Sequence, residues 1–120
     1  MFSKEMRPEK LKFMLLAADM ARAVRFYRQA FGLDEVFLSP HWSELAYGTA
    51  IIAFHSGHDG SPNPTGLSFQ FSDVFDAAER IEKLGGHVLE VPNQREGEPI
   101  LLGRYRDPEG NEGFITQYIA

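Results

Sequence analysis

The sequence contains no cysteine, and this absence removes a range of chemistry. A disulfide framework, a thiolate nucleophile and a cysteine-ligated zinc site all need residues that the chain does not have. An intracellular protein has no need of disulfides, so we expect a cytoplasmic location.

Positive charge and long apolar runs are also scarce. The 12 Lys and Arg against 17 Asp and Glu give a formal net charge of −5. Nucleic acids and anionic membranes bind surfaces with a local excess of positive charge, so neither partner is expected. No apolar run approaches the roughly 20 residues of a membrane span. Met1 to Lys10 are charged and lack the apolar centre of a secretion signal, which predicts a leader strand or a loose arm.

What the sequence does contain is an internal repeat. A helical pattern begins at Asp19, a favourable N-cap, and ends before Gly32, where a left-handed C-cap is expected. A second helical pattern begins at Asp73 and ends before Gly85 and Gly86. The two caps and the two stops keep the same offset, so the chain repeats one supersecondary unit.

One predicted strand precedes each helix and three follow it. Alternation of apolar and polar residues predicts these strands at 11–17, 35–38, 41–47 and 50–55, and at 66–72, 87–91, 100–106 and 112–119. Residues 57–65 are rich in Gly, Ser, Pro and Asn and predict an exposed connector. We therefore predict one α+β domain, residues 1–120, in which two βαβββ modules at about 10–56 and 66–120 share a core.

Several segments resemble a known family. Ala18-Asp19-Met20, Phe26-Tyr27 and Phe31-Gly32-Leu33 look like the opening of a glyoxalase or bleomycin-resistance module. Residues 67–71 resemble the start of its second module, and residues 103–111 resemble its closing hairpin, with Asp107-Pro108-Glu109-Gly110 as a strong turn. The chain thus resembles a single-domain member of the vicinal oxygen chelate superfamily, which also includes extradiol dioxygenases. The resemblance implies a curled, cup-shaped mixed sheet with helices on its convex side and a ligand in its concave cup.

The resemblance also implies four positions where metal-dependent members carry His or Glu ligands. These positions fall on Lys12, Ala53, Gly66 and Phe114. Protonated lysine is a poor ligand and the other three offer no side-chain donor, so we expect no metal and no other cofactor. A slip of two residues brings in His55 and Glu112. Glyoxalase I chemistry and extradiol ring cleavage both need the metal, so both are disfavoured.

Strand alternation gives an independent list of side chains on the concave face. Two aromatic rings are placed to stack on a ligand, and five polar groups are placed to orient it, a combination typical of small-molecule sites. The seven candidate ligand-binding residues are Trp42, Glu44, Ser68, Gln70, Arg104, Phe114 and Thr116. Arg104 is suited to clamp a carboxylate or phosphonate. Structural roles are the alternative for each, among them an ion pair between Glu44 and Arg104.

Three functions follow from these observations. The first is a metal-independent protein that sequesters a small aromatic or amphipathic ligand in the cup. The second is a lyase, isomerase or dioxygenase-like enzyme with a non-standard metal set or with Glu44 as a base, which predicts bound metal or a strongly perturbed carboxylate. The third is a ligand-free scaffold, which predicts that Trp42 and Phe114 touch. An exposed edge strand beside a flexible linker, together with the resemblance, also predicts a homodimer.

Overall fold

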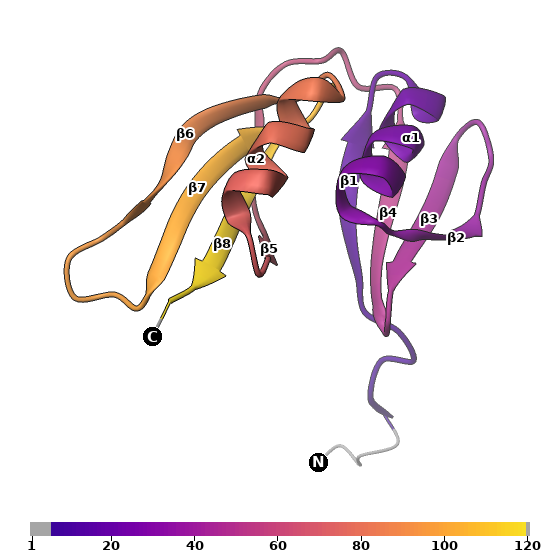
Figure 1. The fold of residues 1–120 in the computed structure, drawn as a ribbon. Helices are drawn as coiled ribbons and strands as arrows, with labels where there is room; N and C mark the ends of the chain where they lie inside the picture. The colour runs from indigo at the N-terminus through magenta and orange to yellow at the C-terminus, as the bar shows by residue number, and fades with distance from the viewer. Residues whose placement is uncertain (1–5, 120) are drawn as a thin grey trace.

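The computed structural model describes residues 6–119, which form two helices and two four-stranded sheets (Figure 1). Module one contains β1 (Lys12–Ala17), α1 (Met20–Phe31), β2 (Asp34–Phe37), β3 (Trp42–Tyr47) and β4 (Ala50–Ser56). Module two contains β5 (Asn63–Gln70), α2 (Val74–Lys83), β6 (His87–Gln94), β7 (Ile100–Arg106) and β8 (Asn111–Tyr118). The predicted α+β fold of two βαβββ modules is confirmed.

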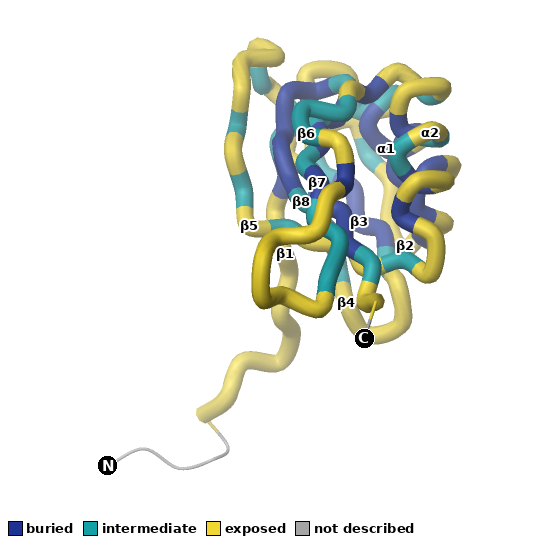
Figure 2. The backbone as a smooth tube through the Cα atoms, turned by 60° about the vertical axis from the view of Figure 1, so that its left-hand side comes forward, coloured by how far each residue is buried: buried dark blue, intermediate teal, exposed yellow. Residues whose placement is uncertain are grey.

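The two sheets have the same topology. Their strand orders are β1-β4-β3-β2 and β5-β8-β7-β6, with the first and last strands of each module parallel and the remaining pairs antiparallel. The sheets lie side by side with β1 and β5 at their inner edges (Figure 1). Both helices lie on one side of the sheets in two views (Figures 1 and 2). We call the other side of the sheets the open face.

Both helices begin where their capping residues predict. The side chain of Asp19 accepts a hydrogen bond from the Arg22 amide at 3.1 Å, and that of Asp73 accepts one from the Asp76 amide at 3.1 Å. Helix α1 ends at Gly32, whose φ of 68° lies in the left-handed region that favours glycine. None of the helices among residues 6–119 is long and apolar enough to cross a membrane.

Strand boundaries differ from the prediction mainly in module two. Strand β5 begins at Asn63, inside the predicted connector, because Asn63 pairs with Asn111 of β8. Strand β6 extends three residues past its predicted end, since it continues to pair with β7 through two shifts of register. Met1 to Glu5 lie outside the described residues, and residues 6–10 are irregular and exposed rather than a strand.

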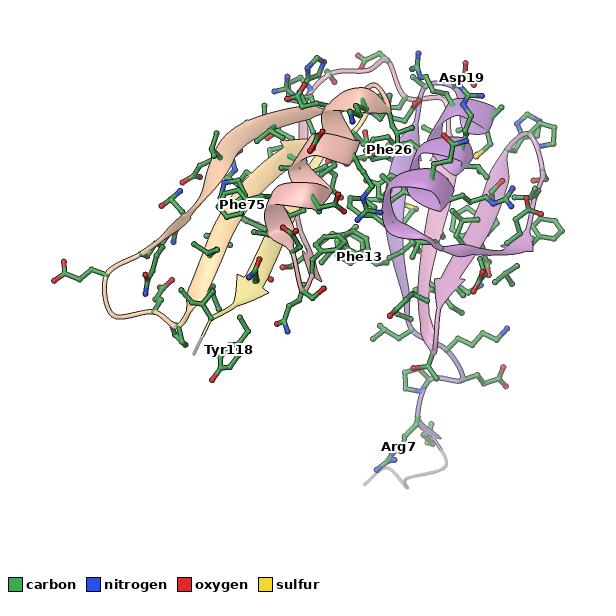
Figure 3. The ribbon with its side chains drawn as sticks, viewed as in Figure 1. Arg7, Phe13, Asp19, Phe26, Phe75 and Tyr118 are labelled. Carbon is green, nitrogen blue, oxygen red and sulfur yellow. The ribbon has the colours of Figure 1, made fainter. Side chains whose placement is uncertain are left out.

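Side chains from both modules meet in one buried cluster. The ring of Phe31 in α1 stacks on that of Phe69 in β5, with 4.2 Å between centroids. The hydroxyl of Tyr27 lies 3.0 Å from that of Tyr105 and donates to the Asp107 carboxylate at 2.8 Å. In Figure 3, Phe26 also lies between the modules. Stacked and edge-on aromatic pairs of this kind add to the stability that buried area provides. Through Phe31 and Tyr27, helix α1 therefore contributes to the contact between the modules.

Candidate ligand-binding face

The open face of the first sheet is built from rows of paired residues. Glu44 of β3 lies opposite Ala53 of β4, and Trp42 lies opposite His55 in the next row. Residues paired across strands point to the same side of a sheet. Ser43, which lies between Trp42 and Glu44, is buried, and Leu45, which follows Glu44, is fully buried in the core on the helix side. Trp42 and Glu44 therefore share the open face, as alternation predicts.

The second sheet repeats this arrangement. Phe114 of β8 lies between Ser68 of β5 and Arg104 of β7, and Thr116 lies beside Gln70 in the next row. Ile115, between Phe114 and Thr116, is fully buried in the core. All seven residues selected by alternation thus lie on the open face of one sheet or the other. Their contact with a ligand stays a prediction.

A buried carboxylate anchors the open face of the first sheet. Oε2 of Glu44 accepts hydrogen bonds from Nζ of Lys12 and from Nε1 of Trp42, both at 2.8 Å. Glu44 is only 8% exposed. The bond from Lys12, followed by that from Trp42, lowers the pKa of Glu44, and burial opposes this effect only in part. Glu44 is therefore ionised at neutral pH and orients the indole ring, whose edge also meets His55.

A second buried carboxylate anchors the open face of the second sheet. Glu112 accepts two bonds from Arg106, at 3.0 and 2.7 Å, and one from Arg104 at 3.2 Å. Glu112 is 7% exposed, whereas the side chains of Arg104 and Arg106 are 39% and 35% exposed. Sequence reasoning did not place Arg106 in the site. Its signal was available, because Arg106 and Glu112 flank the Asp107–Gly110 turn and must pair if that turn closes a hairpin.

Two structural alternatives from the sequence do not hold. The interpretation of Glu44 and Arg104 as an ion pair is wrong, because Glu44 pairs with Lys12 and Arg104 pairs with Glu112, each within its own sheet. The contact between Trp42 and Phe114 that a filled cup requires is absent from the ring contacts of residues 6–119, where Trp42 meets His55 instead.

The side chains at the superfamily's metal positions do not supply its ligand set. Lys12 is held by Glu44, and Ala53, Gly66 and Phe114 have no side-chain donor. Of the residues reached by a two-residue slip, His55 has Nδ1 2.6 Å from the Ser56 carbonyl oxygen, and Glu112 is occupied by two arginines. No group of three or more His, Asp or Glu able to hold a metal occurs in the described part of the chain. Metal independence itself stays a prediction.

The turn after β7 joins the two modules. The Glu109 carboxylate is fully buried and accepts bonds from the amides of Ala18 and Asp19, at 2.9 and 2.7 Å, as well as from Arg22. The Asn111 side chain accepts from the Leu16 amide at 3.0 Å and donates to the Leu16 carbonyl at 2.7 Å. The sequence identified this segment as the turn of a hairpin that resembles the family's closing hairpin, without its contacts to module one. In the structure it is a clasp that holds the end of β1 and the start of α1 against the turn and the first residue of β8.

Replacing Lys12 with methionine is expected to raise the pKa of Glu44, because it removes the main hydrogen bond that favours the carboxylate. The folded state lowers this pKa, so Glu44 contributes stability above its unfolded-state pKa and loses it as the pH falls through the folded-state value. The variant should lose less stability on acidification. Carbon-13 NMR titration of the Glu44 carboxyl checks the shift. Lys83→Met, which removes an exposed partner of Glu79, should leave the Glu44 titration unchanged.

Comparison with known proteins agrees with this architecture. A family model described as a glyoxalase-like domain matches residues 12–116. A glyoxalase/bleomycin resistance protein/dioxygenase family enzyme from Burkholderia phytofirmans PsJN superposes with a TM-score of 0.77 at 19% identity, over 90% of this chain and 97% of the other. A glyoxalase-related enzyme from Fulvimarina pelagi gives 0.71 at 20% identity, over 92% and 88%. A protein from the mobile metagenome of V. Pseudocholerae gives 0.68 at 28% identity, over 96% and 98%. Comparison with curated protein sequences finds no match.

Proposed function

Because the chain belongs to the glyoxalase-like domain family, we propose that it binds a small organic molecule on the open face of its sheets without a metal ion. One observation carries the proposal. Two buried carboxylates, Glu44 and Glu112, are each held by cationic side chains beside an aromatic ring on the same face. A few fixed polar groups next to aromatic surface are typical of small-molecule sites.

Charge on the open face favours a ligand with an anionic group. Lys12, Arg104 and Arg106 provide three cations around the buried carboxylates Glu44 and Glu112, and Glu90 of β6 pairs with Arg104 across the strands. The three cations are about one-third exposed and the carboxylates of Glu44 and Glu112 are buried, so at both positions the cationic groups are the ones that a ligand meets. Arg104 gives only Nη2 to Glu112, which leaves donors for a carboxylate or phosphonate. Trp42 and Phe114 offer ring faces on which the aromatic part of the ligand can stack. The protein would then act by sequestering this ligand.

The lowered pKa of Glu44 favours binding over acid–base catalysis. A general base works best when its pKa lies near the working pH. Lys12 and Trp42 shift the pKa of Glu44 in the opposite direction, which makes this carboxylate a better anchor than a base. The alternative function is a lyase or isomerase that uses Glu44 as a base. Loss of turnover in a Glu44→Gln variant would support this alternative.

We also propose that the protein is a homodimer. Strand β1 stands at the edge of its sheet, and its apolar residues Phe13 and Met14 are both exposed. An unpaired, partly apolar strand edge is a surface that natural proteins usually cover. Analytical ultracentrifugation should show a species of twice the chain mass, and a monomer at all working concentrations would contradict the proposal.

The binding proposal can be tested through Trp42, the single tryptophan of the chain. Tag-free protein is titrated with 1-naphthoate, 1-naphthalenemethanol and 1-naphthylmethylamine while Trp42 fluorescence is recorded. We expect 1-naphthoate to bind most tightly, and we expect Arg104→Gln to weaken it roughly tenfold, the loss of one hydrogen bond to a charged group. Phe114→Ala should weaken all three ligands by removing a stacking surface.

Two controls make this test specific. Phe75→Ala removes an exposed aromatic ring from α2, on the helix side, and should change no affinity (Figure 3). Elemental analysis of protein offered Zn, Ni, Mn and Fe should find no stoichiometric metal. Equal affinity of wild type for the three naphthalenes, or equal affinity of wild type and Arg104→Gln for 1-naphthoate, would contradict the anion site. One bound metal per chain would contradict metal independence.

A further inference from the structure

A groove of about 950 Å³ runs along α1 on the helix side of module one, away from the open face. One wall is a stripe of α1 that includes Met20, Val24, Arg25 and Arg28. The other wall is the segment that follows the helix, through β2 and the loop before β3, and includes Leu38 and Pro40. We call this feature the α1 groove. Its volume is that of a site for a drug-sized ligand.

The α1 groove changes character along its length. The 12 residues of α1 give a length of about 18 Å. Met20 and Val24 make the first half of the helix stripe apolar, and the loop carrying Leu38 rises beside these turns (Figure 1). Leu38 is 47% exposed although it lines the groove. The second half of the stripe carries Arg25 and Arg28, and Asp34 and Glu35 line the facing wall, so the groove runs from an apolar end to a charged end that holds both signs.

Only one of the nearby arginines is available for a ligand. Arg28 is paired with Glu35 at the start of β2, and Arg22 is held by the buried Glu109. Arg25 lines the groove and has no acidic partner among residues 6–119. A guanidinium without an acidic partner, next to the apolar side chains of Met20, Val24 and Leu38, is complementary to a carboxylate attached to an apolar chain.

We propose that the α1 groove is a second binding site, for an amphipathic organic anion. The apolar part of the ligand lies along Met20, Val24 and Leu38, and its carboxylate meets Arg25. Ser43 lines this groove, whereas its neighbours Trp42 and Glu44 belong to the open face. The two sites therefore lie on opposite sides of β3, and either one can exist without the other.

Octanoate and 1-octanol are matched probes, because they share an apolar chain and differ in charge. Nitrogen-15 NMR titration should show saturable octanoate shifts at the Arg25 side chain and in α1 and residues 33–43. Arg104→Gln, which weakens the open-face site, should leave these groove shifts unchanged. Arg25→Gln should weaken octanoate about fivefold, which is the worth of an exposed ion pair, and should leave 1-octanol unchanged.

Two matched controls separate the groove from general effects. Arg95→Gln removes an exposed arginine from the β6–β7 loop and should leave octanoate binding unchanged. Leu38→Asp should abolish octanoate binding, whereas Val91→Asp, at an exposed apolar position on β6, should not. Shifts confined to the open face, or equal effects of Arg25→Gln and Arg95→Gln, would overturn the proposal. The naphthalene titration with Arg104→Gln reports on the open face independently, so the failure of one proposal leaves the other standing.

Discussion

Replacing Asn111 with alanine is expected to lower the free energy of unfolding by about 3–4 kcal/mol, because several buried hydrogen bonds lose their partner together. Asn111 is almost fully buried, and its amide bonds both the amide and the carbonyl of Leu16 in β1. The same amide also joins Asn63 and Asp107, each at 2.8 Å. Its removal leaves the backbone of β1 unsatisfied at the junction of the two modules.

Urea unfolding followed by far-ultraviolet circular dichroism measures this loss. Asn93→Ala is the matched control, because Asn93 is an exposed asparagine on β6 whose side-chain bonds are also exposed. The control should change the free energy of unfolding by no more than about 0.5 kcal/mol. Similar losses in the two variants would contradict the role of Asn111 as a clasp between modules.

Replacing Gly113 with alanine is expected to cost about 2–3 kcal/mol, since the added methyl group would enter occupied space. A Cβ at this position would lie 2.7 Å from the carbonyl oxygen of Leu67 and 2.9 Å from Cε1 of Tyr105. The first contact is with backbone, and Tyr105 is fixed by its hydrogen bond to Tyr27, so neither neighbour moves easily.

Gly66→Ala is the matched control within the same sheet. A Cβ at Gly66 would meet no atom within 4 Å, and the backbone there is not in the left-handed region. Thermal unfolding should show a clear fall in midpoint for Gly113→Ala and little change for Gly66→Ala. A Gly113→Ala variant that unfolds like wild type would contradict the close approach of β5 to β8.

Local sequence patterns were sufficient to predict those features that depend on residues close together in the chain. Asp19 and Asp73 begin their helices because a short acceptor side chain bonds an amide three residues on, and Gly32 ends α1 because glycine tolerates a positive φ. The start of β5 was missed because Asn63 joins the strand through Asn111, a residue far along the chain. No local pattern around Asn63 carries that information.

The same difference between local and long-range information applies to the open face. Alternation assigned Trp42 and Glu44 to one side of β3, because successive side chains of a strand point to opposite sides. It did not identify Lys12 as the partner of Glu44, since β1 reaches β3 only through its parallel pairing with β4. The alternative interpretation of Glu44 and Arg104 as an ion pair is wrong for that reason.

The sequence by itself determined the two βαβββ modules, their helix caps and the side of each strand that faces away from the helices, because each depends on residues close together in the chain. Only the tertiary structure decided the partners of Glu44 and Glu112, the clasp at Asn111 and the groove along α1. Those features depend on strand register and on how tightly distant segments pack, and packing is set by all the contacting surfaces at once.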